Sequence, residues 1–79
     1  MLTDEQAKTA ISQNLTRILD EKGRSVYWLM KALDVSSGTI YPIVRGEQQP
    51  SLGFASRIAD VLEIDVSDLL QEVHKKNRK

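Results

Sequence analysis

Apolar residues recur along this chain with the spacing of helices, and polar capping residues separate one apolar segment from the next. In the first segment, apolar residues lie three and four positions apart, which places them on one face of a helix. These residues are Ala7, Ile11, Leu15, Ile18 and Leu19. Thr3 and Gln6 resemble a capping box ahead of this face, and Gly23 is a typical C-terminal cap. The pattern therefore predicts a first helix that ends at Gly23.

Two shorter helices are predicted in the middle of the chain. Ser25 is a favourable N-cap for the segment "VYWLMKAL", residues 26–33. Asp34 interrupts this helix, and Ser36 is the N-cap of a third helix that continues to Gly46. The interval between the two helices is short, so they are expected to pack against each other.

Two further helices are predicted after the polar loop "GEQQP", residues 46–50. Ser51 caps a fourth helix, and Asp65 with Asp68 begins a short fifth helix. Their apolar positions are Leu52, Ala55, Ile58, Ala59, Leu62, Val66, Leu69, Leu70 and Val73. No segment alternates as a strand does. The sequence predicts an all-α fold with five helices in a single domain, residues 1–73.

Pro42 lies inside the third predicted helix. A proline there removes one backbone hydrogen bond and crowds the preceding turn, at a cost of about 3 kcal/mol. Two arrangements remain open: a kinked helix capped by Ser36, or an irregular turn over residues 36–39 before a short helix that begins at Pro42. We favour the kinked helix because it keeps Ile40 and Ile43 at core spacing.

Composition excludes several kinds of chemistry. The chain has no cysteine, which rules out disulfides and thiolate metal sites, and His74 is its single histidine. No nucleophile has a base within plausible reach, so we expect neither an enzyme nor a cofactor. No apolar run approaches the roughly 18 residues of a membrane span, and the N-terminus lacks a signal-peptide pattern. We therefore expect a cytoplasmic protein without a membrane partner.

Charge is unevenly distributed although the net charge is zero. Residues 22–50 and 74–79 carry an excess of basic side chains, whereas residues 1–21 and 51–73 carry an excess of acidic ones. Such asymmetry can orient a protein on a phosphate backbone. The basic tail, residues 74–79, has nothing apolar to bury and is expected to be disordered.

The second and third predicted helices match the helix-turn-helix pattern at about residues 25–45. Its core residues would be Leu29, Leu33, Val35, Ile40 and Ile43. Here the sequence resembles the phage-repressor or Xre-type helix-turn-helix regulators over residues 11–70. The matching positions are Gly23, Ser25, Leu29, Ala32, Leu33, "VS" at 35–36, "TI" at 39–40, Ile43, "RG" at 45–46, "PSL" at 50–52, "IA" at 58–59, Leu62 and "DVSDLL" at 65–70. The resemblance implies a five-helix repressor-type DNA-binding domain that acts as a homodimer on double-stranded DNA.

The resemblance also implies which residues touch DNA. Bases would be read from the first, second and sixth residues of the third helix, which are Ser37, Gly38 and Pro42. Glycine has no side chain, proline has no donor, and serine discriminates little between bases. Specificity would then depend on Thr39, Tyr41 and DNA shape. The other expected contacts, mainly to phosphates, are Arg24, Ser25, Lys31, Ser36, Arg45, Gln48 and Gln49.

Two functions follow from this interpretation. The favoured one is a DNA-binding transcriptional regulator, a repressor, that places its third helix in the major groove. The alternative is a protein-binding adaptor, such as an antirepressor or antitoxin, that uses its unusually apolar second helix. Trp28 in that helix could pack beneath the first helix or the tail, contact a protein partner, or contact nucleic acid. Of these three roles, we favour internal packing.

Overall fold

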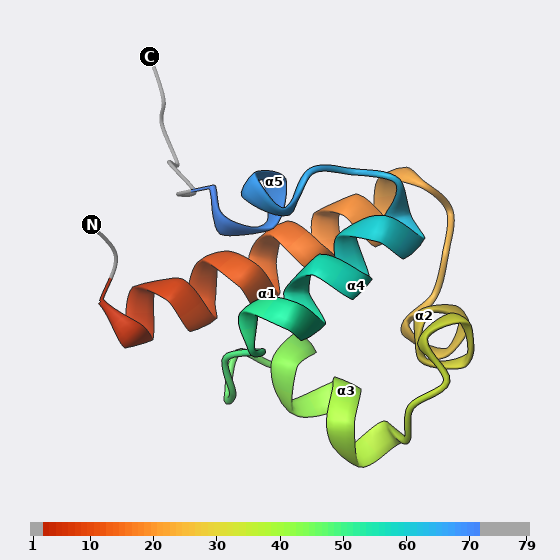
Figure 1. Cartoon of the computed structure of the whole chain (residues 1–79), viewed down its shortest axis with the longest axis horizontal. Helices are drawn as coiled ribbons and strands as arrows, with labels where there is room; N and C mark the ends of the chain where they lie inside the picture. Colours follow the sequence, from red (N-terminus) through yellow and green to blue (C-terminus); the bar gives the residue numbers. More distant parts are fainter. Residues whose placement is uncertain (1–2, 72–79) are drawn as a thin grey trace.

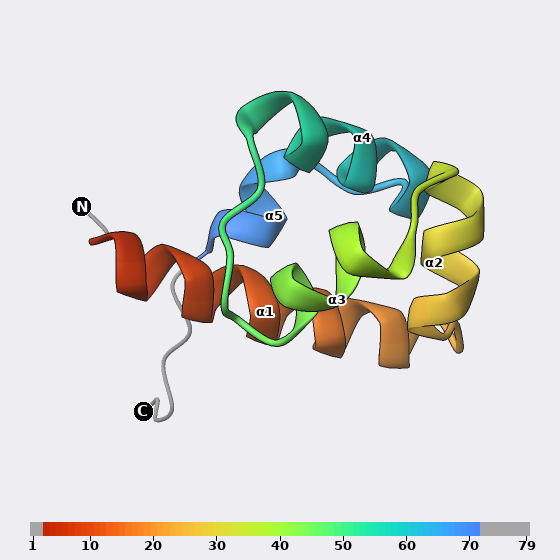
Figure 2. The same cartoon turned by 90° about the horizontal axis from the view of Figure 1, so that it is seen from below.

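The computed structural model describes residues 3–71, which form five helices and no strand. The helices are α1 (Asp4–Glu21), α2 (Val26–Leu33), α3 (Ser37–Val44), α4 (Leu52–Leu62) and α5 (Val66–Leu70). Helix α1 runs along the molecule, and α3 and α5 pack against it. Helix α4 packs on α5, and α2 stands across the ends of α1 and α4 (Figures 1 and 2). The predicted all-α architecture is confirmed. The basic tail, residues 74–79, lies outside the described residues.

One apolar cluster holds the helices together and includes residues from all five of them. Its fully buried members are Ile11, Leu15, Leu29, Leu33, Ile40, Ile58, Leu62 and Leu69. The apolar face predicted for α1 is buried along its whole length. Leu52 was expected in the core, but 72% of its surface is exposed, because it is the first residue of α4 and the buried face begins one turn later, at Ala55. Leu70, at the C-terminal end of α5, is also exposed.

The helix ends follow most of the predicted caps. Thr3 and Gln6 form the reciprocal capping box of α1, and Gly23 has a positive φ of 67° just after its end. The hydroxyl of Ser25 accepts the Trp28 N–H at 3.0 Å. Ser36 occupies the N-cap position of α3, but its side chain does not cap the helix.

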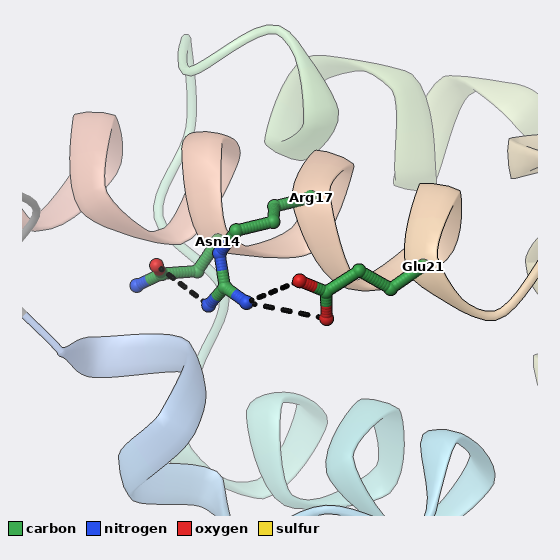
Figure 3. A network of polar contacts seen from close by, with 3 residues as sticks. All are labelled: Asn14, Arg17 and Glu21. Atoms are coloured by element: carbon green, nitrogen blue, oxygen red, sulfur yellow. Dashed lines mark hydrogen bonds and ion pairs between the residues drawn. The ribbon is translucent and has the colours of Figure 1, made fainter.

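A buried polar residue joins α1 to the end of α5. The Asn14 side chain is 2% exposed, and its Nδ2 donates to the carbonyl oxygens of Leu69 at 2.9 Å and Gln71 at 2.7 Å. Arg17 donates to Asn14 Oδ1 at 3.4 Å and pairs with Glu21 one turn further along α1 (Figure 3). The amide of Asn14 therefore satisfies carbonyl groups that the short α5 leaves without helical partners. Within residues 3–71, no helix has both the length and the apolar character needed to cross a membrane.

Candidate nucleic-acid interface

Helices α2 and α3 form a helix-turn-helix unit around a tight turn at Asp34. Asp34 has a left-handed conformation with φ of 58°, and its N–H donates to the Lys31 carbonyl at 3.1 Å. The next N–H, from Val35, donates to the Met30 carbonyl at 3.2 Å. Aspartate tolerates this conformation better than most residues because its short polar side chain can hydrogen-bond locally. The turn reverses the chain within a few residues and sets α3 against α2.

Four of the five expected core residues of this unit are buried. Leu29 and Leu33 of α2 pack with Ile40 and Ile43 of α3, and each is at most 2% exposed. Val35 was expected to be buried but is only partly so. It lies at the corner of the turn, where a shallow groove of about 210 Å³ opens between the end of α2 and the start of α3. The buried residues hold α3 at a fixed angle to α2.

Helix α3 is continuous from Ser37 to Val44, with Pro42 as its sixth residue. The alternative of a short helix beginning at Pro42 is therefore wrong, whereas the kink stays a prediction. At the other end, Gly46 has a φ of 78°, its N–H donates to Ile43, and the Glu47 N–H donates to Pro42 at 2.8 Å. This pattern is a Schellman motif, in which the carbonyl of Pro42 is satisfied by the chain that follows the helix.

The first turn of α3 is exposed and carries only small side chains. Ser36, Ser37, Gly38 and Thr39 are all exposed, and the Ser36 and Thr39 hydroxyls lie 3.3 Å apart. The Ser36 hydroxyl therefore turns to Thr39 instead of capping the helix. Within residues 3–71, the N–H groups of Ser37 and Gly38 have no hydrogen-bond acceptor. This turn offers unpaired backbone donors at the positive end of the helix dipole.

Tyr41 and Pro42 lie further along α3 and are half-buried. Tyr41 packs against the apolar cluster, so only part of its side chain reaches the surface. The sequence assigned Tyr41 a large share of base recognition, and this packing reduces the side-chain area available for that role. The exposed surface in this region therefore comes mainly from the first turn of α3 and from the loop that follows the helix.

Arg45, at the C-terminal end of α3, is held by an acidic neighbour. Its Nε donates to Glu47 Oε2 at 3.0 Å and its Nη2 donates to Glu47 Oε1 at 3.2 Å. These hydrogen bonds, and secondly the opposite charge, raise the pKa of Arg45 and lower the pKa of Glu47, so the pair is fully charged at neutral pH. The sequence predicted a phosphate contact for Arg45 but not its ion pair with Glu47, although an acidic residue two positions after an arginine was a signal for such a pair. Gln48 and Gln49 are exposed on the same loop.

The outer face of α2 combines aromatic and basic side chains. The Arg24 guanidinium lies 4.7 Å from the centre of the Trp28 ring, and Lys31 Nζ lies 5.9 Å from the centre of the Tyr27 ring. Trp28 is partly buried against the apolar cluster, whereas Tyr27 is 59% exposed. The position of Trp28 is therefore explained by packing against the core, with the Arg24 guanidinium over its ring. Tyr27 is the exposed aromatic residue of this face.

Arg57 supports the helix-turn-helix from α4, a role that the sequence did not reveal. Its Nη2 donates to the Leu33 carbonyl at 2.7 Å, at the C-terminal end of α2. A cation at that end satisfies an unpaired carbonyl and complements the helix dipole. Arg57 stands in a segment rich in acidic residues, but nothing in the local sequence identifies a partner 24 positions away.

The predicted contact residues fall into four groups. Ser36 to Thr39 form the start of α3, and Tyr41 and Pro42 lie further along it. Arg45 and the two glutamines follow its end, and Arg24, Ser25 and Lys31 lie on or just before α2. The structure brings the first group together with α2 at the turn and places the loop at the opposite end of α3 (Figure 2). Among the described residues, no group of three His, Cys, Asp or Glu side chains is arranged to hold a metal ion.

Comparisons with known proteins agree with this arrangement. A family model described as a Cro/C1-type HTH DNA-binding domain matches residues 14–74. A crystal structure of an HTH_3 family transcriptional regulator from Vibrio cholerae is similar, with 28% sequence identity and a TM-score of 0.77. The match covers 85% of this chain and 38% of the Vibrio protein. None of the curated proteins compared matches this chain.

Proposed function

Because this chain belongs to the family of Cro/C1-type helix-turn-helix DNA-binding domains, we propose that it is a transcriptional regulator that places α3 in the major groove of double-stranded DNA. The observation that carries this proposal is the exposed first turn of α3, which has small side chains and unpaired N–H groups. Small side chains let the helix backbone approach base edges and phosphates closely, and the N–H groups are donors for phosphate oxygens.

The charged groups around α3 suit the positioning of a phosphate backbone. Arg24 and Lys31 are exposed on the α2 side, and Arg45 is exposed at the far end of α3. Phosphate contacts from such residues fix register and orientation, while contacts to base edges supply sequence preference. We propose a homodimer that represses transcription by occupying a two-fold operator, as the resemblance to phage repressors implies.

Selection of binding sites from random duplex DNA tests this function. We expect an enriched palindrome with two half-sites, because each protomer of a dimer would present one α3. Affinity for the enriched site should fall steeply as salt rises, since phosphate contacts release counterions. An unenriched pool, together with binding that vanishes near physiological salt, would contradict the proposal.

A protein-binding adaptor remains the second candidate because of the outer face of α2. Tyr27 is 59% exposed there and lies beside Lys31 and the Arg24–Trp28 pair. Exposed aromatic residues are enriched at protein–protein interfaces. An interface on this face would leave the first turn of α3 free, so the two functions predict different effects of substitutions at Ser37 and Tyr27.

Replacing Glu47 by glutamine should raise DNA affinity about fivefold, because it removes a charge that repels phosphate and releases the Arg45 guanidinium. A released Arg45 adds about one unit to the slope of log affinity against log salt for each bound chain. Titration of the selected duplex over a range of salt concentrations measures both quantities.

The matched control is Glu63→Gln, which removes the same charge at the C-terminal end of α4, outside the predicted contacts. Equal effects of the two variants would show that only net charge matters.

Because the pKa of Glu47 is lowered, this carboxylate stays charged in mildly acidic solution, and the wild-type pair is lost only as pH falls through that lowered value. Between about pH 8 and pH 5, the solution stays above the ordinary pKa of a glutamate side chain. Over this range, loss of the Arg45–Glu47 pair should therefore not raise the DNA affinity of the wild-type protein.

A further inference from the structure

Gly38 and Pro42 stand four residues apart in α3, the spacing of a helical hydrogen bond. In a regular helix the carbonyl of residue 38 accepts the N–H of residue 42. Proline has no N–H, so the Gly38 carbonyl has lost that donor. Within residues 3–71, no side chain donates to this carbonyl in its place. The Gly38–Pro42 pair thus leaves a backbone acceptor near the start of α3 without its regular helical donor.

This acceptor lies on the exposed side of α3. Residues four apart share one face of a helix, so the carbonyl lies on the face that carries Gly38 and Pro42. Gly38 is exposed and has no side chain to cover its own carbonyl, and even an added Cβ would meet only the Ser36 hydroxyl, at 3.9 Å. Carbonyl groups on the solvent side of a helix tilt outward, and one without a helical donor is freer to do so.

We propose that the Gly38 carbonyl reads sequence by accepting a hydrogen bond from an exocyclic amino group in the major groove. This inference rests on the proposed function, because it requires α3 to lie in that groove. The amino groups exposed there are N4 of cytosine and N6 of adenine, whereas guanine and thymine present acceptor oxygens. At one base pair in each half-site, the strand that the carbonyl contacts should therefore favour both cytosine and adenine over guanine and thymine.

This assignment explains how a helix with a poor side-chain code can still discriminate between sequences. Ser37 discriminates little, Gly38 lacks a side chain, and Pro42 lacks a donor. Together, however, Gly38 and Pro42 provide one carbonyl that has lost its regular helical donor. A neutral hydrogen bond of this kind contributes about fivefold in affinity. The competing explanation is contact between the Pro42 ring and a thymine methyl, which predicts a thymine preference instead.

Three chains of the full 79 residues, made by chemical synthesis, test the assignment. The first is wild type and the second carries Pro42→Ala, which restores the N–H at position 42. The third carries lactic acid at position 42, so that an ester replaces the amide. It matches the alanine variant in its methyl side chain but, like proline, has no N–H. Thermal unfolding identifies a temperature at which all three chains are folded.

Each chain is used for selection from random duplex DNA and then titrated against the wild-type site and its single-base variants. The wild-type and ester chains should both favour cytosine or adenine about fivefold at one position of each half-site, and Pro42→Ala should lose most of that preference. If the ester chain behaves like Pro42→Ala, or if all three chains share one profile, the carbonyl is not the reading group. A wild-type site in which no base pair shows a shared preference for cytosine and adenine on one strand overturns the inference alone. A wild-type selection that yields no site overturns the proposed function together with the inference.

Discussion

Replacing Asn14 by leucine should lower the free energy of unfolding by about 3 kcal/mol, although leucine is similar in size and matches the apolar face of α1. The substitution removes the donor for the Leu69 and Gln71 carbonyl groups. A buried carbonyl left without a partner costs about 1–3 kcal/mol, and the Gln71 carbonyl, being less deeply buried, contributes the smaller share. The loss is a large part of the stability of a small domain, which is about 5–15 kcal/mol.

Chemical denaturation with the far-ultraviolet circular dichroism signal measures this change. Gln13→Leu is the matched control, because Gln13 is the exposed neighbour of Asn14 in the same helix and should change stability by no more than about 0.5 kcal/mol. Similar stability changes in the two variants would mean that the Asn14 hydrogen bonds contribute nothing net. A second variant, Asn14→Asp, keeps the side-chain shape but sets a carboxylate against two carbonyl oxygens, and should be destabilised at neutral pH.

The helices could be predicted because their signals are local in sequence. Thr3 and Gln6, Ser25, and Ser51 each cap a helix through contacts three residues away. The apolar spacing of α1 identifies its buried face without knowledge of the partners. The prediction was less accurate where a local side chain had an alternative hydrogen-bond partner. Ser36 stands at the N-cap of α3, yet its hydroxyl turns to Thr39.

The supports of the interface could not be predicted because they depend on tertiary contacts. The partners of Asn14 lie 55 and 57 positions away, and the Arg57–Leu33 hydrogen bond joins α4 to α2. The sequence contained a hint, since Asn14 is a polar residue three positions after Ile11 on an otherwise apolar face. Without the position of α5, that hint does not show which groups the amide satisfies. The exposure of Leu52 likewise depends on where α4 begins relative to the core.

Replacing Ser37 by glutamate should weaken DNA binding about 100-fold, because it places a negative charge at the start of the proposed reading helix, and facing like charges cost several kcal/mol. The stability of the folded protein should not decrease. Ser37 is exposed and is the first residue of α3, where an acidic side chain favours the helix dipole by about 0.5 kcal/mol. Loss of DNA binding together with equal or greater stability is therefore the expected result, measured by titration of the selected duplex and by thermal unfolding.

The control is Ser67→Glu, which adds the same charge to the exposed first turn of α5, a helix that packs on α1 and α4. This variant should bind DNA within about threefold of wild type, because its charge lies away from the proposed contacts and is largely screened at physiological salt.

Tyr27→Ala distinguishes the adaptor function from DNA binding, since it removes the exposed aromatic side chain of α2 and leaves α3 unchanged. DNA binding that survives Ser37→Glu would contradict placement of α3 in the groove. If association with a protein partner were then lost with Tyr27→Ala, the outer face of α2 would be the functional surface.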